Sequence, residues 1–311
     1  MAMKPPFRIA LVGVGKTARD LHMPSIRRNA DFQLAAGVSR HETIDGVDNF
    51  TGLEALFEAR PDIRVLALCM PPQARYGYAI EALRAGRHVL LEKPPGATLG
   101  EIETLVEAAK SHGCTLFALW HSRFAPAVEL ARRWLLSREI KSVRLAWKED
   151  VHYWHPGQTW IWEAGGLGVF DPGINGLSIL TDILPFPVHV AGARLEVPEN
   201  CQTPIAAELV FAGPRDASIQ ASFDFRQTGP QIWDIEVVTG SGTMHLSRAG
   251  CVMRVDGVVV KEAPETEYDG IYARLSELLR SGGSDVDVAP LRIVADAFLT
   301  GERVPTDPFT P

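Results

Sequence analysis

Short apolar runs alternate with helical patterns from Arg8 to about Trp120. Each run is too short for a helix and ends at glycine, proline or polar residues, which indicates buried strands at residues 8–12, 32–38, 64–69, 89–91 and 115–119. Helical patterns follow most of these runs, at about residues 16–28, 51–59, 73–85 and 98–112. Because helical crossovers join parallel strands, residues 1–121 predict a doubly wound parallel sheet of the α/β class.

After residue 121 the pattern changes to alternation at period two. It covers residues 142–148, 188–197, 205–211, 218–225 and 232–238, with shorter runs up to residue 260. Turns such as Thr239–Gly242 and Asp256–Gly257 are typical of hairpins. With helices expected at about residues 125–136, 170–184, 266–281 and 290–299, residues 122–311 predict an α+β domain with an open-faced, mostly antiparallel sheet. One face of such a sheet must be covered or paired, so we expect a homodimer contact there.

Composition limits the classes of partner. The 311 residues are 46% hydrophobic and carry a net charge of −7, which argues against nucleic acid and anionic membranes as main partners. No apolar run approaches the twenty or so residues of a membrane-spanning helix. The four cysteines lie far apart with no C-x-x-C pattern, which predicts free thiols in a reducing cytoplasm. We therefore expect a cytoplasmic protein that acts on a small molecule.

A glycine motif follows the first predicted strand. The chain reads Gly13-x-Gly15-x-x-Ala18, with Lys16 and Thr17 opening a helix. The first glycine permits a tight turn, the second lets a pyrophosphate approach the backbone, and the small third residue lets helix and strand pack closely. Free N–H groups at the start of the helix then bind the phosphates. The strand before the motif and the helix after it predict a Rossmann domain that binds a dinucleotide.

The end of the second predicted strand bears on cofactor choice. A site selective for NAD usually has an acidic residue there, whereas this chain has Ser39 and Arg40. A guanidinium and a hydroxyl suit a 2′-phosphate, so we predict that NADP is preferred and that NAD is possible. The alternative is that Arg40 stacks on the adenine or faces solvent.

The run His88–Pro95 places a lysine at a strand end. Three apolar residues lead into Glu92, Lys93 and two prolines, and a proline cannot donate to a strand ladder. The strand must therefore stop at Glu92 or Lys93, at the carboxyl edge where ligands bind in open α/β sheets. Lys93 is a candidate acid or base. The alternative is a surface lysine beside a turn.

A chemically dense segment lies between the first strand of the second half and the next helix. It holds Glu149, Asp150, His152, Trp154, His155, Trp160, Trp162 and Glu163. These side chains also suit simple packing over the sheet. Zinc is another alternative because His152 and His155 have ligand-like spacing, but no further ligand follows in a recognisable pattern, so no metal is predicted.

The helix expected at residues 170–184 begins with a second candidate group. Asp171 and Asn175 are four residues apart and share one helix face. For Asp171 the alternative is an N-cap aspartate before Pro172, and for Asn175 it is a surface amide.

Together these motifs resemble the glucose–fructose oxidoreductase / inositol dehydrogenase (Gfo/Idh/MocA) family. The matching segments are Gly13–Ala18, Glu92–Pro94 and Asp171–Asn175, in that order, and the two-domain architecture also matches. Most of the family has histidine where this chain has Asn175, which cannot exchange a proton near neutral pH. The segments around Trp147, Trp154 and Gly166 are similar to those of the bacterial L-arabinose 1-dehydrogenase / D-galactose 1-dehydrogenase group, in which asparagine is normal.

The resemblance implies a function and assigns roles. It implies an NAD(P)-dependent aldose 1-dehydrogenase that oxidises C1 of L-arabinose or D-galactose to the aldonolactone. Another sugar or inositol dehydrogenase, and a non-catalytic NADP-binding sensor, are the alternatives. The implied catalytic residues are Lys93, Asp171 and Asn175, and the implied sugar-binding residues are Glu149, His155, Trp154, His121 and Trp233. Cofactor contacts are expected from the glycine motif and from Ser39, Arg40, Cys69, Pro71, Glu92, Lys93 and His121. The family also implies a cis bond before Pro94.

Overall fold

The computed structural model describes residues 5–213 and 216–310, which form two compact units. The N-terminal unit comprises the chain up to Trp120 together with Tyr268–Asp287. The C-terminal unit comprises His121–Glu267 and the chain from Val288 onward. The prediction that residues 122–311 form one continuous domain is therefore wrong for Tyr268–Asp287.

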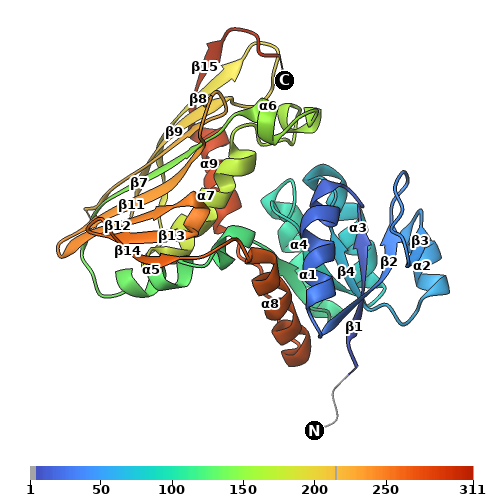
Figure 1. Cartoon of the computed structure of the whole chain (residues 1–311). Coiled ribbons are helices and arrows are strands. Elements are labelled where there is room, and N and C mark those ends of the chain that lie inside the picture. The colour runs from blue at the N-terminus through green and yellow to red at the C-terminus, as the bar shows by residue number, and fades with distance from the viewer. Residues whose placement is uncertain (1–4, 214–215, 311) are drawn as a thin grey trace. The chain divides into compact units, whose positions relative to one another are not determined.

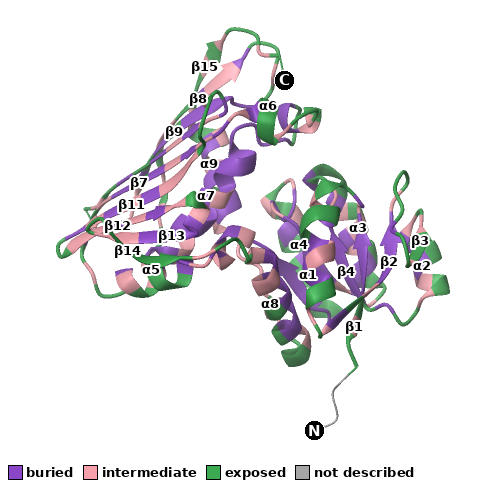
Figure 2. Cartoon of the chain, viewed as in Figure 1, coloured by how far each residue is buried: buried purple, intermediate pink, exposed green. Residues whose placement is uncertain are grey.

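The N-terminal unit is built on a parallel sheet, as predicted (Figure 1). Its six strands lie in the order β3-β2-β1-β4-β5-β6. They are β1 (Phe7–Val12), β2 (Phe32–Val38), β3 (Asp48–Phe50), β4 (Val65–Leu68), β5 (His88–Leu91) and β6 (Leu116–Ala118). The central strands β1, β4 and β5 are almost entirely buried (Figure 2). Only β3 was not predicted, because its three residues are exposed or half-buried and lack an apolar run.

Helices connect these strands close to the predicted positions. They are η1 (Ala18–His22), α1 (Met23–Arg28), α2 (Leu53–Ala59), α3 (Pro72–Arg84) and α4 (Leu99–Ser111). The predicted capping box of α4 is present: Thr98 accepts from the N–H of Glu101, and the Glu101 carboxylate accepts from the N–H of Thr98. The first helix contains one π-helical turn, η1, which periodicity does not reveal.

Helix α8 (Glu267–Ser281) returns the chain to the N-terminal unit. Its buried face includes Tyr272 and Leu275, and the ring of Tyr272 packs edge-on against Phe32 on β2 (5.4 Å between centroids). Asp31 accepts hydrogen bonds from Ser276 (2.5 Å) and the Arg280 guanidinium (2.6 Å). These contacts explain why the segment belongs to this unit despite its place in the sequence.

The C-terminal unit contains a nine-stranded mixed sheet with order β14-β13-β12-β11-β7-β10-β9-β8-β15. Six of its adjacent pairs are antiparallel, whereas β7 with β10 and β8 with β15 are parallel. The strands are β7 (Ile140–Lys148), β8 (His189–Pro198), β9 (Ala206–Ala212), β10 (Ser218–Asp224), β11 (Ile232–Thr239), β12 (Gly242–Ser247), β13 (Val252–Val255), β14 (Val258–Glu262) and β15 (Glu302–Thr306). The mostly antiparallel sheet is thus confirmed, and β15 is an addition.

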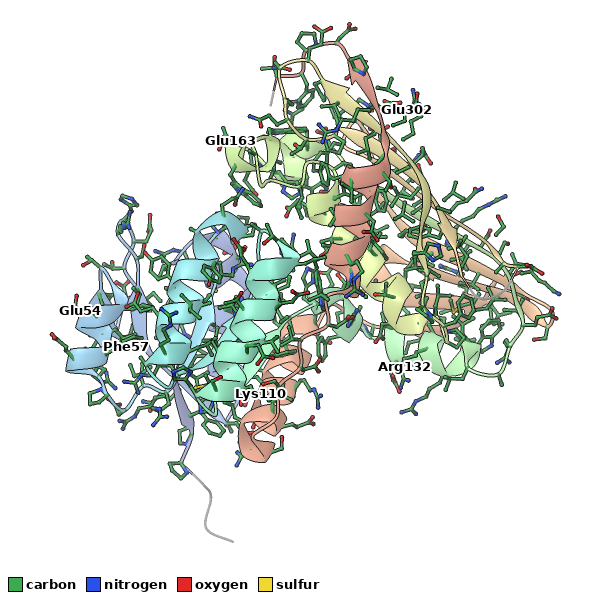
Figure 3. The ribbon with its side chains drawn as sticks, turned by 180° about the vertical axis from the view of Figure 1, so that it is seen from behind. Glu54, Phe57, Lys110, Arg132, Glu163 and Glu302 are labelled. Carbon is green, nitrogen blue, oxygen red and sulfur yellow. The ribbon has the colours of Figure 1, made fainter. Side chains whose placement is uncertain are left out.

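Helices cover one face of this sheet (Figure 1). They are α5 (Val128–Leu135), α7 (Phe170–Ile183) and α9 (Ala289–Thr300), while η2 (His121–Phe124), α6 (Val151–Trp154), η3 (Thr159–Trp162) and η4 (Arg248–Gly250) are shorter. Figure 3 shows Arg132 on α5 and Glu302 at the start of β15. The opposite face carries no helix between His121 and Thr310, as far as those residues are described.

Two glycines allow α7 to lie close to the sheet. A Cβ at Gly173 would come within 2.6 Å of the Phe223 ring on β10, and one at Gly176 within 2.7 Å of the Trp147 ring on β7. This close packing fixes the height of α7, and therefore of Asp171 in its first turn, above the sheet.

Two other properties concern the chain as a whole. The cysteines Cys69, Cys114, Cys201 and Cys251 are all free thiols. Within residues 5–213 and 216–310, no helix has the length and apolar character needed to cross a membrane.

We predict that Gly173→Ala destabilises the protein by about 1–3 kcal/mol, because the added methyl group overpacks the contact with Phe223. The matched control is Gly77→Ala in α3, where a Cβ meets nothing within 4 Å. Removing an exposed glycine from a helix interior is expected to stabilise the protein by about 0.5–1 kcal/mol. Urea denaturation of both variants measures the difference, and equal midpoints would contradict the packing argument.

Candidate active site

The glycine motif of the N-terminal unit has the geometry of a phosphate-binding loop. Gly13 has a left-handed backbone (φ +86°), and a Cβ there would lie 2.7 Å from the backbone nitrogen of Met70. Gly15 and Lys16 are exposed, and a Cβ on Gly15 would meet nothing within 4 Å. Ala18 is fully buried between helix and strand. The loop therefore fits the pyrophosphate of a dinucleotide, with Lys16 and Thr17 at the start of the helix.

Ser39 and Arg40 follow β2 in a turn that is held by hydrogen bonds. The Ser39 hydroxyl accepts from the backbone N–H groups of His41 (3.4 Å) and Glu42 (3.2 Å). Arg40 is exposed. Arg19, which the motif analysis did not single out, donates to the Glu42 carboxylate (2.7 Å) and to the carbonyl of Thr43 (3.0 Å). The loop after β2 is thereby tied to the helix of the glycine motif.

Three strand ends meet at one edge of the parallel sheet. Val12, Leu68 and Leu91, the last residues of β1, β4 and β5, are partners in register. The residues that follow are Gly13, Cys69 and Glu92. This register brings the glycine motif, the Cys69–Pro71 segment and the Glu92–Pro94 turn to the same edge, as the sequence predicted.

The Glu92–Pro94 turn contains the expected cis bond between Lys93 and Pro94. Lys93 is half-buried, and its backbone N–H donates to the Glu92 carboxylate (2.7 Å). Glu92 is buried, and its carboxylate also accepts from Tyr268 on α8 (2.5 Å) and from His22 (3.0 Å). Sequence reasoning missed His22 and Tyr268. A contact between Glu92 and the cofactor stays a prediction.

Buried Arg75 on α3 holds the same turn from another side, and no sequence signal pointed to it. Its guanidinium donates to the carbonyl oxygens of Met70, Glu92 and Pro94. The ends of β4 and β5 are thus joined by one side chain.

The C-terminal unit brings together Glu149, His155 and Asp171. The Glu149 carboxylate accepts from His155 Nε2 (2.8 Å), and His155 Nδ1 lies 3.7 Å from the Asp171 carboxylate. Glu149 and Asp171 are buried, and His155 is nearly so. Glu149 follows β7, His155 follows α6, and Asp171 lies in the first turn of α7.

Indole rings lie beside this cluster. Trp233 on β11 donates its Nε1–H to Glu149 (2.8 Å), so that both carboxylate oxygens are engaged. The ring of Trp233 lies 5.0 Å from that of Trp154 and stacks on that of Trp147 at 5.8 Å. Trp154 is partly exposed. Polar groups next to broad apolar rings suit a ligand that has hydroxyl groups on one side and C–H groups on the other.

The remaining candidate residues occupy different positions. Asn175 lies one turn after Asp171 on the same face of α7 and is half-buried. Asp171 is not the N-cap, because the helix begins at Phe170 with Val169 in the capping position. His121 begins η2, and its Nδ1 lies 3.4 Å from the Ser122 hydroxyl. His152, the other residue of the zinc alternative, is exposed and packs against Phe309.

Comparisons with known proteins give this arrangement a family. The model of an oxidoreductase family with an NAD-binding Rossmann fold (Gfo/Idh/MocA) matches residues 7–119. The galactose 1-dehydrogenase of Pseudomonas fluorescens is 44% identical over 304 residues, covering 98% of this chain and 99% of that protein. The chain belongs to the Gfo/Idh/MocA family.

Solved structures extend the comparison. The crystal structure of a D-galactose-1-dehydrogenase protein from Rhizobium etli has a TM-score of 0.97 and 54% identity, and all of both chains is covered. KijD10, a 3-ketoreductase from Actinomadura kijaniata solved with NADP and TDP-benzene, has a TM-score of 0.83 at 16% identity and covers 97% of this chain and 99% of that one. At that identity it shows the fold alone. As a Gfo/Idh/MocA member, this protein is an NAD(P)-dependent oxidoreductase that acts on CH–OH groups.

Proposed function

We propose that the protein is an aldose 1-dehydrogenase that oxidises C1 of D-galactose, L-arabinose or both to the aldonolactone and reduces NADP⁺. The observation that carries the proposal is the buried Glu149–His155–Asp171 cluster beside Trp233 and Trp154. Carboxylates and an imidazole bind sugar hydroxyls, and indole rings cover the apolar face of a pyranose. The similarity to two galactose dehydrogenases over nearly the full chain supports the same substrate class.

The reaction needs a hydride acceptor and a proton acceptor. The dinucleotide, which the Gly13–Ala18 loop and the Ser39–Arg40 turn would hold, would supply the hydride acceptor. The anomeric hydroxyl loses its proton as C1 becomes a carbonyl, so a base must lie within hydrogen-bond reach of O1. The products are the lactone, the reduced dinucleotide and one proton.

Two groups are candidates for the base. Lys93 lies two residues after β5, at the carboxyl edge of the parallel sheet, and Asp171 lies in the first turn of α7. Asn175 has no proton to exchange near neutral pH, so its proposed role is to orient a sugar hydroxyl. Glu149, His155 and His121 are proposed to bind the remaining hydroxyls, with Trp154 and Trp233 at the sugar ring.

We also propose that the protein is cytoplasmic and forms a homodimer through the helix-free face of the nine-stranded sheet. Outward positions along the sheet carry charges of both signs, including Arg144 on β7, Glu208 on β9 and Glu236 on β11. A second copy can pair such charges across a two-fold axis. The four free cysteines support a reducing compartment.

Initial rates of NADPH formation with D-galactose, L-arabinose, D-fucose, D-xylose and D-glucose test the substrate class. We expect D-galactose or L-arabinose to give the highest kcat/KM, because relatives that match nearly the full chain are galactose 1-dehydrogenases and L-arabinose differs from D-galactose only in the group at C5. Preference for an inositol would make the protein another dehydrogenase of the family. A protein that binds NADP but reduces none with any sugar would be a sensor and would overturn the proposal.

Lys93→Met and Asp171→Asn identify the proton acceptor. Loss of a general base lowers kcat by about 10²–10⁴-fold, so we expect a loss of this size for the residue that takes the proton. Stopped-flow measurement of the chemical step at saturating substrate reports it. The controls are Lys110→Met on α4 and Glu163→Gln, both exposed side chains (Figure 3), which should retain turnover. Whichever active-site variant keeps near-wild-type turnover is not the acceptor.

Arg40→Ala tests the choice of cofactor. A charge-assisted hydrogen bond contributes about 1.5–3 kcal/mol, so kcat/KM for NADP should fall by about 10–100-fold while the value for NAD changes little. Steady-state kinetics with both dinucleotides gives the ratio, and Arg27→Ala, an exposed arginine on α1, is the control. An unchanged ratio of the two efficiencies would remove Arg40 from the site.

A further inference from the structure

A buried polar network lies beneath the turn that carries Lys93, and the proposed reaction does not use it. Its members are His22 (0% exposed), Glu92 (4%), Tyr268 (6%) and Tyr272 (0%). Polar groups removed from water cost free energy unless they are hydrogen-bonded, and removing a carboxylate costs most. Four such groups in one cluster therefore need a physical reason.

The hydrogen bonds of the network form a continuous chain from Tyr272 to the backbone of Lys93. Tyr272 on α8 places its hydroxyl 2.7 Å from His22 Nδ1, and His22 Nε2–H donates to Glu92 Oε1 (3.0 Å). The Tyr268 hydroxyl donates to the same oxygen (2.5 Å). The other oxygen, Oε2, accepts the backbone N–H of Lys93 (2.7 Å). The direction of the Glu92 carboxylate thus determines where the peptide nitrogen of Lys93 lies.

The charge states of the network agree with this order of donors and acceptors. Burial raises the pKa of Tyr268 well above its ordinary value and that of Tyr272 to about 12, so both hydroxyls stay protonated. The Tyr268 hydroxyl donates to Glu92, whereas the Tyr272 oxygen accepts from the protonated Nδ1 of His22. Burial alone would lower the pKa of His22, but Cys69, Tyr272 and Glu92 around the ring raise it well above its usual value. The imidazole therefore keeps its Nε2 proton directed at Glu92.

The opposite side of the same turn is held independently. Arg75 donates to the carbonyl oxygens of Glu92 (2.5 Å) and Pro94. The peptide unit before Lys93 and the one after Pro94 are thus bound by buried side chains, the first through the Glu92 carboxylate and Arg75 and the second through Arg75 alone. Such support keeps a reacting group within the narrow range of positions that catalysis needs.

We propose that His22, backed by Tyr272, is a positioning residue for the reaction: it aims the Glu92 carboxylate at the backbone of Lys93 and so fixes the turn from which the Lys93 side chain projects. The inference rests on the proposed role of Lys93. It predicts that loss of His22 reduces the chemical step more than cofactor binding, because Gly13, Gly15 and Ser39 are held by hydrogen bonds to residues outside this network.

The test compares His22→Leu with His22→Gln. Leucine removes both hydrogen bonds, whereas glutamine keeps an N–H that can reach Glu92. A displacement of about 1 Å at a reacting group can cost about 100-fold in rate, so we expect His22→Leu to lower kcat by about 10–100-fold while the dissociation constant for NADP changes less than about threefold. His22→Gln should restore most of the rate. Tyr272→Phe should lower kcat in the wild type and have no further effect in His22→Leu.

The matched control is His88→Leu. His88 begins β5, at the opposite end of the strand from Glu92, and its Nδ1 accepts the backbone N–H of Thr115 (2.9 Å). It should lower the melting temperature and leave kcat unchanged. If His22→Leu behaves in the same way, or if His22→Gln restores stability but not rate, the network is structural only and the proposal fails. The proposed function fails separately, when Lys93→Met retains turnover or the wild type oxidises no sugar.

Discussion

A carboxylate removed from water must be given hydrogen-bond donors, and this requirement organises one cluster of candidate residues in each unit. In the N-terminal unit Glu92 takes donors from His22, Tyr268 and the backbone of Lys93. In the C-terminal unit Glu149 takes them from His155 and Trp233. Each carboxylate therefore fixes side chains from several elements at once.

The strand ends make this arrangement possible. Parallel strands β1, β4 and β5 end in register. The segments that follow them, Gly13–Ala18, Cys69–Pro71 and Glu92–Pro94, therefore lie at one edge of the sheet. In the other unit the close approach of α7 through Gly173 and Gly176 sets Asp171 above the sheet. In the proposed function, the N-terminal unit binds the dinucleotide and the C-terminal unit binds the sugar hydroxyls.

Local sequence patterns predicted most strands of the parallel sheet and the segments at its carboxyl edge. The apolar runs, the glycine motif and the prolines after Lys93 act within a few residues, so they could be read directly from the chain. Long-range contacts could not be predicted in this way. His22 and Tyr268 lie 70 and 176 residues from Glu92. The apolar periodicity of α8 indicates that one of its faces is buried, but not which unit that face packs against. The three-residue strand β3, the π turn η1 and strand β15 have no distinctive pattern.

Some candidate site residues could likewise be predicted from local patterns, whereas others depend on long-range contacts. Asp171 and Asn175 share a helix face by spacing alone, whereas Trp233 and His121 entered only through resemblance to a family. Trp233 joins the Glu149 cluster because β11 pairs with β7, and Trp233 and Trp147 are partners in that pairing. A strand pairing of this kind depends on the whole sheet, so the sequence around Trp233 could not reveal it.

The central claim is that hydride leaves C1 of an aldose. The most direct measurement uses D-galactose carrying deuterium at C1, with the reduced dinucleotide isolated and analysed by mass spectrometry. The account predicts that one deuterium appears on the nicotinamide ring and that the sugar product is the unlabelled lactone. Deuterium retained in the sugar product, with unlabelled NADPH, would place the oxidation at another carbon and contradict the account.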